Sequence, residues 1–318
     1  MPLMLLKSPN VSLVIPLFNE LEMLPLLVQE VEEFRNIRTE ITEVIFVNDG
    51  STDGSPQKVE ELTRHLAGYK LISFPRNFGH QIAVTAGLDF VGTDAAIIMD
   101  ADLQDPLEVA GQMIDIWQEG FDVVYGIRKE RDGESVFKRL SASVFYRFFK
   151  WITDLDIPID TGDFRLVSRQ VIQAYKQVTE HQPFIRGLIT WLGYHQKGIE
   201  YKRASRRAGR TKYPFRKMLK LAINAVTAFS DKPLRIAIQV GVATSFLAAI
   251  GIIWVLYTRF VLHTTIPGWA SSTLIVLFLG GVQMLFLGII GVYLARIYGE
   301  VKRRPRYILK DIWQSDGG

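Results

Sequence analysis

Two carboxylates separated by one small residue are the clearest candidates for chemistry in this chain. Asp100 and Asp102 stand in the run MDADLQDP at 99–106, after a hydrophobic segment and before a turn. Such carboxylates repel each other unless a cation lies beside them, and hard oxygen ligands suit Mg²⁺ or Mn²⁺. A divalent ion here would neutralise charge on a departing nucleoside diphosphate. The same pattern also occurs as plain carboxylates in a turn, so the pair needs support from its surroundings.

Other polar side chains follow the neighbouring apolar segments in the same way. They are Asn19 and Glu20 after the first segment, Asn48, Asp49, Ser51 and Asp53 after the second, Arg76, Asn77 and His80 after the third, and Gln104 and Asp105 beside the aspartate pair. If these segments are parallel strands, the polar residues converge at one edge of a sheet, where ligands of such sheets bind. The turn GSTDGS at 50–55 lacks the lysine of a phosphate-binding P-loop, and no Gly-x-Gly-x-x-Gly follows the first segment. Dinucleotide-binding and P-loop ATPase functions are therefore disfavoured.

The elements that must position these residues alternate along the first hundred residues. Four short segments are apolar and rich in β-branched residues, which predicts buried parallel strands over 11–17, 43–49, 69–74 and 94–100. Apolar residues recur at helical spacing between them, over 24–34, 59–66 and 81–90. The alternation predicts an α/β domain with a mostly parallel sheet flanked by helices.

The C-terminal third has a different composition. Residues 236–257 and 274–294 carry no charge and are long enough to cross a hydrocarbon layer as helices. The alternative is a pair of buried core helices. Basic residues flank the two segments on their outer sides, at Arg216, Lys217, Lys220, Lys232 and Arg235 and at Arg296, Lys302, Arg303, Arg304 and Arg306. This charge bias predicts two transmembrane helices with both termini and the α/β domain in the cytoplasm.

A basic amphipathic stretch precedes the first predicted span. Over 212–230, apolar residues including Phe215 recur at helical spacing, while Lys212 and other cations occupy the opposite face. Such a helix is expected to lie in the lipid headgroup region. A similar stripe over 135–152 fits domain packing and membrane contact equally well. The predicted organisation is a cytosolic domain over 1–211, a juxtamembrane helix over 212–231, a two-helix membrane region over 232–298 and a basic cytosolic tail over 299–318.

Composition limits the chemistry further. The 318 residues include no cysteine, so disulfides, thiolate zinc sites and cysteine nucleophiles are excluded. The 37 Lys and Arg against 33 Asp and Glu, with 48% hydrophobic residues, predict a folded chain of small net charge.

Three motifs together resemble the family 2 glycosyltransferases, which have a GT-A fold: VIPLFNE at 14–20, VNDGSTDGS at 47–55 and DADLQDP at 100–106. FPRNFGHQ at 74–81, TGDFRLVSR at 161–169 and RRAGRTKY at 206–213 are similar to the branch that contains dolichyl-phosphate mannose synthases and bactoprenol glucosyltransferases. The resemblance implies inverting transfer of a hexose to a polyprenyl phosphate such as undecaprenyl phosphate. UDP-glucose is the first choice of donor, with GDP-mannose or a UDP-linked aminopentose as alternatives.

The resemblance also implies roles for individual residues. The nucleotide pocket would be formed by Pro16, Asn19, Glu20, Asp49, Arg76 and Asp100. The metal would be held by Asp102 with Gln104 and Asp100. The phosphates would be held by Arg128, Arg139 and Arg206, with Arg207, Arg210, Lys212 and Phe215 near the acceptor phosphate or the membrane. Asp163 would position the sugar or assist as a base, and we favour positioning.

A phosphate acceptor agrees with this set of residues. Its oxygen is anionic near neutral pH, so it can attack the anomeric carbon without a strong general base or an activated Ser, Cys or His. The implied partners are a sugar nucleotide, a polyprenyl phosphate and the plasma (inner) membrane, without nucleic acid. Glycines such as Gly280 and Gly281 in the second span would permit close packing in a homo-oligomer.

Two other functions are compatible with parts of the sequence. A processive polysaccharide synthase of the same superfamily would normally carry a Gln-x-x-Arg-Trp motif and more spans, and neither is present. A catalytically silent membrane subunit that binds sugar nucleotides would not need the aspartate pair.

Overall fold

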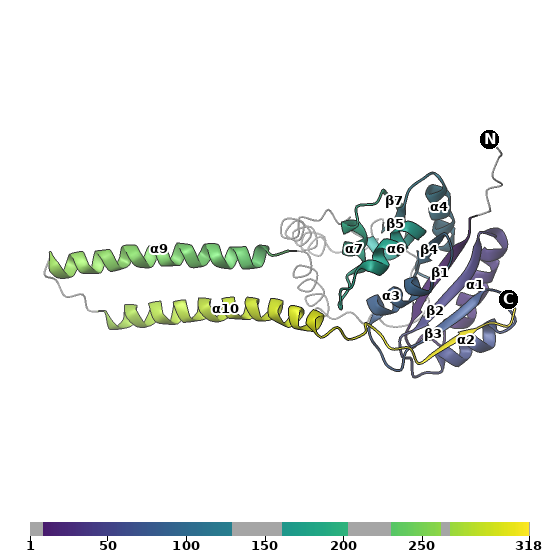
Figure 1. The fold of residues 1–318 in the computed structure, drawn as a ribbon, viewed down its shortest axis with the longest axis horizontal. Coiled ribbons are helices and arrows are strands. Elements are labelled where there is room, and N and C mark those ends of the chain that lie inside the picture. Colours follow the sequence, from purple (N-terminus) through teal and green to yellow (C-terminus); the bar gives the residue numbers. More distant parts are fainter. Residues whose placement is uncertain (1–8, 129–160, 203–229, 262–267, 318) are drawn as a thin grey trace. The chain divides into compact units, whose positions relative to one another are not determined.

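The computed structural model describes residues 9–128, 161–202, 230–261 and 268–317, which belong to two units (Figure 1). The first unit contains the described residues up to 128, residues 161–202 and residues 304–317. The second contains residues 230–261 and 268–303. The amphipathic stretches predicted over 135–152 and 212–230 lie outside the described residues, apart from Ser230.

One sheet organises the first unit, with strand order β7-β5-β6-β4-β1-β2-β3-β8. Its strands are β1 (Val11–Leu17), β2 (Ile41–Asn48), β3 (Tyr69–Ser73), β4 (Ala95–Ile98), β5 (Val123–Arg128), β6 (Thr161–Ser168), β7 (Gln196–Tyr201) and β8 (Asp311–Gln314). Strands β1 to β4 run parallel, as do β5 and β7, whereas β6 is antiparallel to β4 and β5 and β8 is antiparallel to β3. The predicted α/β fold with a mostly parallel sheet is confirmed.

Helices cover both faces of this sheet (Figure 1). One face packs against α1 (Leu24–Ile37), α2 (Ser55–Thr63) and α4 (Leu107–Gln118), which enclose the larger apolar core. The other face packs against α3 (His80–Phe90). On that face α6 (Arg169–Gln177) contacts α3, and α7 (Ile185–Trp191) contacts α6. All seven residues of β1 are buried because the strand is covered on both faces. Because β1 to β4 run parallel, their carboxyl ends meet at one edge of the sheet. This is the edge at which the polar residues were predicted to converge.

The C-terminal strand was not predicted from the sequence. Within the range 299–318, expected to be a separate basic tail, Asp311–Gln314 pairs with β3, Ile72 standing opposite Ile312. Trp313 packs against the core on the α1 side of the sheet. Residues 304–317 are therefore part of the α/β unit. The strand has only four residues and its partner lies some 240 positions earlier, so no local pattern marks it.

The second unit consists of α9 (Lys232–Phe260) and α10 (Trp269–Val301). Each contains a window long and apolar enough to cross a membrane, at Lys232–Gly251 and Phe278–Val301. Neither window is buried within the structure, and Ile238, Phe246 and Trp254 of α9 are 61–66% exposed. Core helices of a soluble domain would bury such side chains, so this exposure favours the membrane interpretation over the alternative.

Candidate active site

The aspartate pair lies just beyond the end of β4, at the sheet edge. Leu103 has a positive φ of 52°, so the chain turns sharply after Asp102. This turn directs the backbone N–H of Gln104 onto Asp102 Oδ1 at 3.2 Å. The side chain of Gln104 is buried, whereas Asp100 and Asp102 are partly exposed. Strand and turn together present both carboxylates at the predicted edge.

Asp163, itself buried, is the centre of a polar cluster beside this pair. It lies in β6, and its Oδ1 accepts a hydrogen bond from Arg186 Nε at 2.7 Å. Its Oδ2 accepts from Gln81 Nε2 at 2.9 Å and from His80 Nε2 at 3.1 Å. His80 Nε2 is also 3.8 Å from Asp100 Oδ1. Asp163 thus joins the first turns of α3 and α7 to the sheet, and His80 links it to the aspartate pair.

The charges in this cluster stabilise one another. Desolvation acts to raise the pKa of Asp163, but the charge of Arg186 and the hydrogen bond from His80 outweigh it and hold the pKa well below its usual value. Desolvation acts to lower the pKa of His80, yet Asp163 and Asp100 raise it to about 9. At neutral pH the cluster therefore contains an ionised Asp163 and a protonated His80. A carboxylate held ionised in this way is a poor acceptor of a proton.

The aspartate pair has the donor chemistry for Mg²⁺ or Mn²⁺. Burial raises the pKa of Asp100, and the carboxylates of Asp105, Asp163 and Asp102 raise it further against the opposing effect of His80. A cation would relieve this crowding of negative charge. Among the described residues no group of three or more His, Cys, Asp or Glu could hold a metal. Mg²⁺ is usually bound by one or two carboxylates and completed by substrate phosphates, which is the donor set that Asp100 and Asp102 would offer.

On the β1 and β2 side of the edge, two loops are tied together by hydrogen bonds. The backbone N–H of Asn19 donates to Ser51 Oγ, and its side-chain oxygen accepts from the N–H of Thr52, both at 2.9 Å. The N–H of Glu20 donates to Ser55 Oγ at 3.1 Å. Asn19 adopts a positive φ of 55°, a conformation that asparagine tolerates better than most residues. Pro16 lies buried within β1, directly before this loop.

Asp49 holds the loop that precedes α3. Its carboxylate accepts hydrogen bonds from the backbone N–H groups of Phe78, at 2.6 Å, and Gly79, at 3.0 Å to Oδ2. Arg76 lies on the same loop with its guanidinium over the Phe78 ring, 3.9 Å from the ring centre. Burial raises the pKa of Asp49, although these N–H donors and the charges of His80 and Arg76 oppose it. The predicted nucleotide residues Asp49 and Arg76 therefore lie on two neighbouring loops that hydrogen bonds hold together.

Arg128, predicted to hold phosphate, lies at the end of β5. Its Nε donates to the Tyr201 hydroxyl at 3.3 Å, and that hydroxyl donates to Asp105 Oδ1 at 2.7 Å. Gly162 lies directly beneath the guanidinium, because a Cβ at this glycine would be 2.4 Å from Arg128 Nη2. The absence of a side chain at Gly162 is what lets the guanidinium lie against β6.

Comparisons with known proteins identify the family of this chain. A family model described as Glycosyl transferase family 2 matches residues 12–176, more than half of the chain. An uncharacterised glycosyltransferase of Bacillus subtilis is 45% identical, covering 94% of this chain and 93% of that protein. The chain belongs to glycosyl transferase family 2. It is therefore a glycosyltransferase, as the motifs predicted.

Two more known proteins are similar to this family 2 glycosyltransferase. A prophage bactoprenol glucosyl transferase homolog of Escherichia coli is 38% identical over 95% of this chain and 99% of its own length. A solved mannosyltransferase of Pyrobaculum calidifontis in complex with GDP-Man and Mn²⁺ is 16% identical, with a TM-score of 0.45, covering 94% of this chain and 88% of that one. The family assignment depends on the sequence matches.

The structure brings together only part of the predicted site of this glycosyltransferase. Asp100, Asp102, Gln104 and Asp163 gather around β4 and β6, whereas Asn19, Glu20, Asp49 and Arg76 form the neighbouring loops. Several predicted residues lie outside the described residues, namely Arg139, Arg206, Arg207, Arg210, Lys212 and Phe215. Conversely, Gln81, Arg186 and Tyr201 were not singled out from the sequence. Arg186 is 23 positions from its partner Asp163 and belongs to a different element, so spacing could not reveal the pair.

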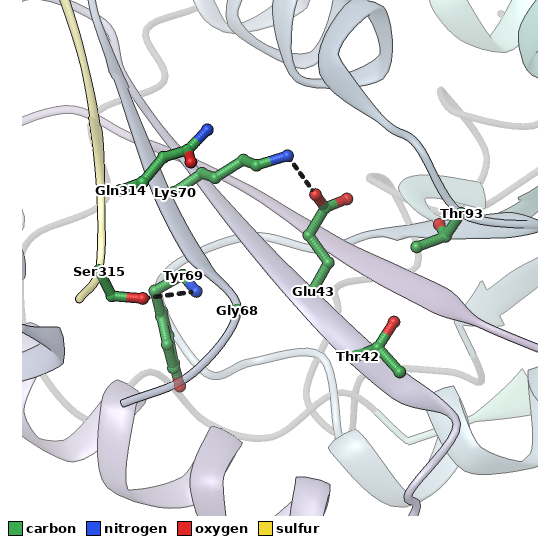
Figure 2. A pocket seen from close by; sticks show the side chains of 8 residues that line it. All are labelled: Thr42, Glu43, Gly68, Tyr69, Lys70, Thr93, Gln314 and Ser315. Atoms are coloured by element: carbon green, nitrogen blue, oxygen red, sulfur yellow. Dashed lines mark hydrogen bonds and ion pairs between the residues drawn. The ribbon is translucent and has the colours of Figure 1, made fainter. Parts of the chain in front are cut away.

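A separate cleft of about 260 Å³ lies at the opposite edge of the sheet, where β2 and β3 begin (Figure 2). It is lined by Thr42, Glu43, Gly68, Tyr69, Lys70, Thr93, Gln314 and Ser315. Lys70 and Glu43 form an ion pair across it, and the backbone N–H of Tyr69 donates to Ser315 Oγ. None of the predicted site residues lines this cleft, so it is distinct from the candidate active site.

Proposed function

We propose that this family 2 glycosyltransferase transfers a hexose to the phosphate of a polyprenyl phosphate, with UDP-glucose as the first choice of donor. The observation that carries the proposal is the ionisation and hydrogen bonding of Asp163. This residue is the one that the resemblance would allow as a base, yet Arg186 and His80 hold it ionised and hydrogen-bonded. A hydroxyl acceptor would need a base, whereas a phosphate acceptor does not.

The reaction is a single displacement. An anionic phosphate oxygen attacks the anomeric carbon, a new C–O bond forms, and the bond to the diphosphate breaks with its electron pair leaving on UDP. No proton has to be transferred, and one displacement inverts the anomeric configuration. The residues then act by positioning and by charge. Asp49 and Arg76 would orient the nucleotide, Arg128 would hold phosphate, and Asp163 would fix His80 next to Asp100.

A divalent cation is part of this proposal. Asp102 would hold Mg²⁺ or Mn²⁺, with Asp100 and Gln104 beside it. When bound, the ion supplies positive charge to the departing diphosphate. The support is the crowding of carboxylates around Asp100 and the hard oxygen donors at the end of β4.

A lipid acceptor is supported by two independent observations. The apolar helices α9 and α10 expose large apolar side chains, as membrane helices do. Relatives at 37–38% identity from Shigella phages bear the name bactoprenol glucosyl transferase. We propose a multi-pass protein of the plasma (inner) membrane whose α/β domain and termini are cytoplasmic, where soluble donor meets the lipid head.

A donor panel tests this function. Purified full-length protein in detergent, with Mg²⁺ and undecaprenyl phosphate, is incubated separately with labelled UDP-glucose, GDP-mannose and a UDP-aminopentose. We expect one lipid-linked sugar, formed from UDP-glucose. Product from another donor would support the proposed reaction with a different sugar. Measurable nucleotide binding with no product from any donor would contradict the proposal and favour a non-catalytic binding subunit.

A further inference from the structure

The segment that follows α10 contacts the core of the α/β unit through Tyr307. The Tyr307 ring stacks on Phe74, which directly follows β3, with ring centres 5.2 Å apart and an interplanar angle of 22°. The Tyr307 hydroxyl donates to Asp89 Oδ2 of α3 at 3.0 Å. Three residues later, the backbone N–H of Lys310 donates to the carbonyl of Ser73 at 2.8 Å. Tyr307 is therefore held from both sides, by α3 and by the start of the β8 pairing.

Phe74 passes this contact on to the loop before α3. Its ring meets the Phe78 ring edge to face, with centres 5.5 Å apart and an interplanar angle of 77°. Phe78 is the residue whose backbone N–H donates to Asp49 and whose ring lies beneath the Arg76 guanidinium. Ring contacts thus join Tyr307 to Phe78, which contacts two of the residues predicted to bind the nucleotide, Asp49 and Arg76.

In this aromatic relay (Tyr307, Phe74 and Phe78), each ring can fix the position of the next one. Phe74 is fully buried, so its ring cannot move without a rearrangement of the α3 side of the core. Phe78 by contrast belongs to an irregular loop, whose position depends on what packs against it. Stacked and edge-to-face ring pairs have preferred geometries, so removal of one ring changes the preferred place of the next.

We propose that Tyr307 is a positioning residue for donor binding: through Phe74 and Phe78 it sets the loop that carries Arg76 and that is hydrogen-bonded to Asp49. This inference depends on the nucleotide-binding role proposed above for that loop. It assigns to the segment after α10 a part in the active site that does not require contact with the reacting groups. Donor affinity consequently depends on residues 304–311, which follow the second apolar helix directly.

The test compares three variants at one position in full-length protein. Tyr307→Phe keeps the ring and loses the hydrogen bond to Asp89, Tyr307→Leu keeps apolar volume without a ring, and Tyr307→Ala removes both. The readouts are the Kd for UDP by titration and the kcat and donor KM for glycolipid formation. We expect Tyr307→Ala and Tyr307→Leu to raise the Kd and KM about three- to tenfold with kcat within about twofold, and Tyr307→Phe to stay near the parent.

Two controls separate positioning from general stability. Ile308→Ala changes an exposed neighbour and should leave both constants unchanged. Trp313→Ala weakens the same segment where it packs on the opposite face of the sheet, and should lower the Tm without raising the Kd for UDP. Unchanged Kd in Tyr307→Leu, or an equal rise in Trp313→Ala, would overturn the inference. Because UDP binding is measured directly, a parent that binds UDP without forming glycolipid would contradict the proposed function and still allow the relay to be tested.

Discussion

The residues of this site show how the same type of side chain receives different tasks from its surroundings. Asp100 lies among other carboxylates, which disfavour its charged form. Asp163, only one strand away, receives Arg186, Gln81 and His80 and remains ionised. The first environment suits a cation, whereas the second suits a fixed negative charge that orients its neighbours. We therefore expect Asp163 to act as a positioning residue and not as a base.

Replacement of Asp163 by Asn distinguishes these two roles. If Asp163 positions His80 and Arg186, kcat should fall about tenfold, because the isosteric amide keeps part of the hydrogen bonding. Loss of a general base typically costs about 10²- to 10⁴-fold. The measurement is kcat for glycolipid formation with saturating donor and acceptor, with circular dichroism and Tm to establish that the variant is folded. A fall beyond about 10³-fold in a folded variant would assign the base role to Asp163.

The burial and composition of each strand explain which features could be predicted from the sequence. Strands β1 to β4 were expected because each is buried on both faces and reads as a short apolar run. Strands β5 to β8 were not expected, since they mix polar and apolar residues and pair with distant segments. The edge residues Asp100, Asp102 and Asp49 follow predicted strands and so could be found. Arg186 lies on α7 and Tyr201 on β7, and only the fold reveals that these elements lie near the site.

Gly50 offers a test at the scale of the loops. It has a φ of +71°, and a Cβ there would be 2.3 Å from the carbonyl carbon of Arg76. Gly50→Ala should therefore displace the loop that carries Arg76 and raise the donor KM about tenfold, as small misplacements in a site do. KM measured with varied UDP-glucose checks this.

Gly54 provides the matched control for that substitution. Its φ is +89°, and a Cβ there would have no atom of the described residues within 4 Å. Gly54→Ala should cost about 1 kcal/mol of stability from the left-handed conformation alone and leave the donor KM within about twofold. An equal rise of the donor KM in the Gly50 and Gly54 variants would show that backbone strain, and not loop displacement, controls donor binding.

At the scale of the molecule, the chain combines an α/β unit with two exposed apolar helices. The sequence predicted these helices from their lack of charge, and their orientation from the basic flanks. It also predicted that residues 299–318 stand apart from the domain, whereas β8 belongs to the sheet. A deletion of everything after residue 231 would remove β8 and Tyr307 together with the helices. Loss of activity in such a truncation could not be assigned to the membrane region.

Orientation can instead be tested on the full chain, because it contains no cysteine. Thr264→Cys places a thiol between the two predicted spans, and Ile37→Cys places one on α1, where Ile37 is 78% exposed. A membrane-impermeant maleimide added to intact cells should label the first variant and not the second. Permeabilised cells should label both, and the cysteine-free parent should stay unlabelled. Labelling of Ile37→Cys in intact cells would contradict the cytoplasmic placement of the domain.

On the proposed function, the carboxylates after β4 hold a divalent cation together with the donor diphosphate. Binding of Mn²⁺ to the full-length protein, followed by electron paramagnetic resonance with and without UDP, tests it directly. We predict tight uptake of Mn²⁺ only with UDP present, and at least about tenfold weaker uptake by Asp102→Asn. Asp115→Asn, which alters a carboxylate of α4 that pairs with Arg38, should bind like the parent. Uptake by Asp102→Asn as tight as that of the parent would contradict the claim.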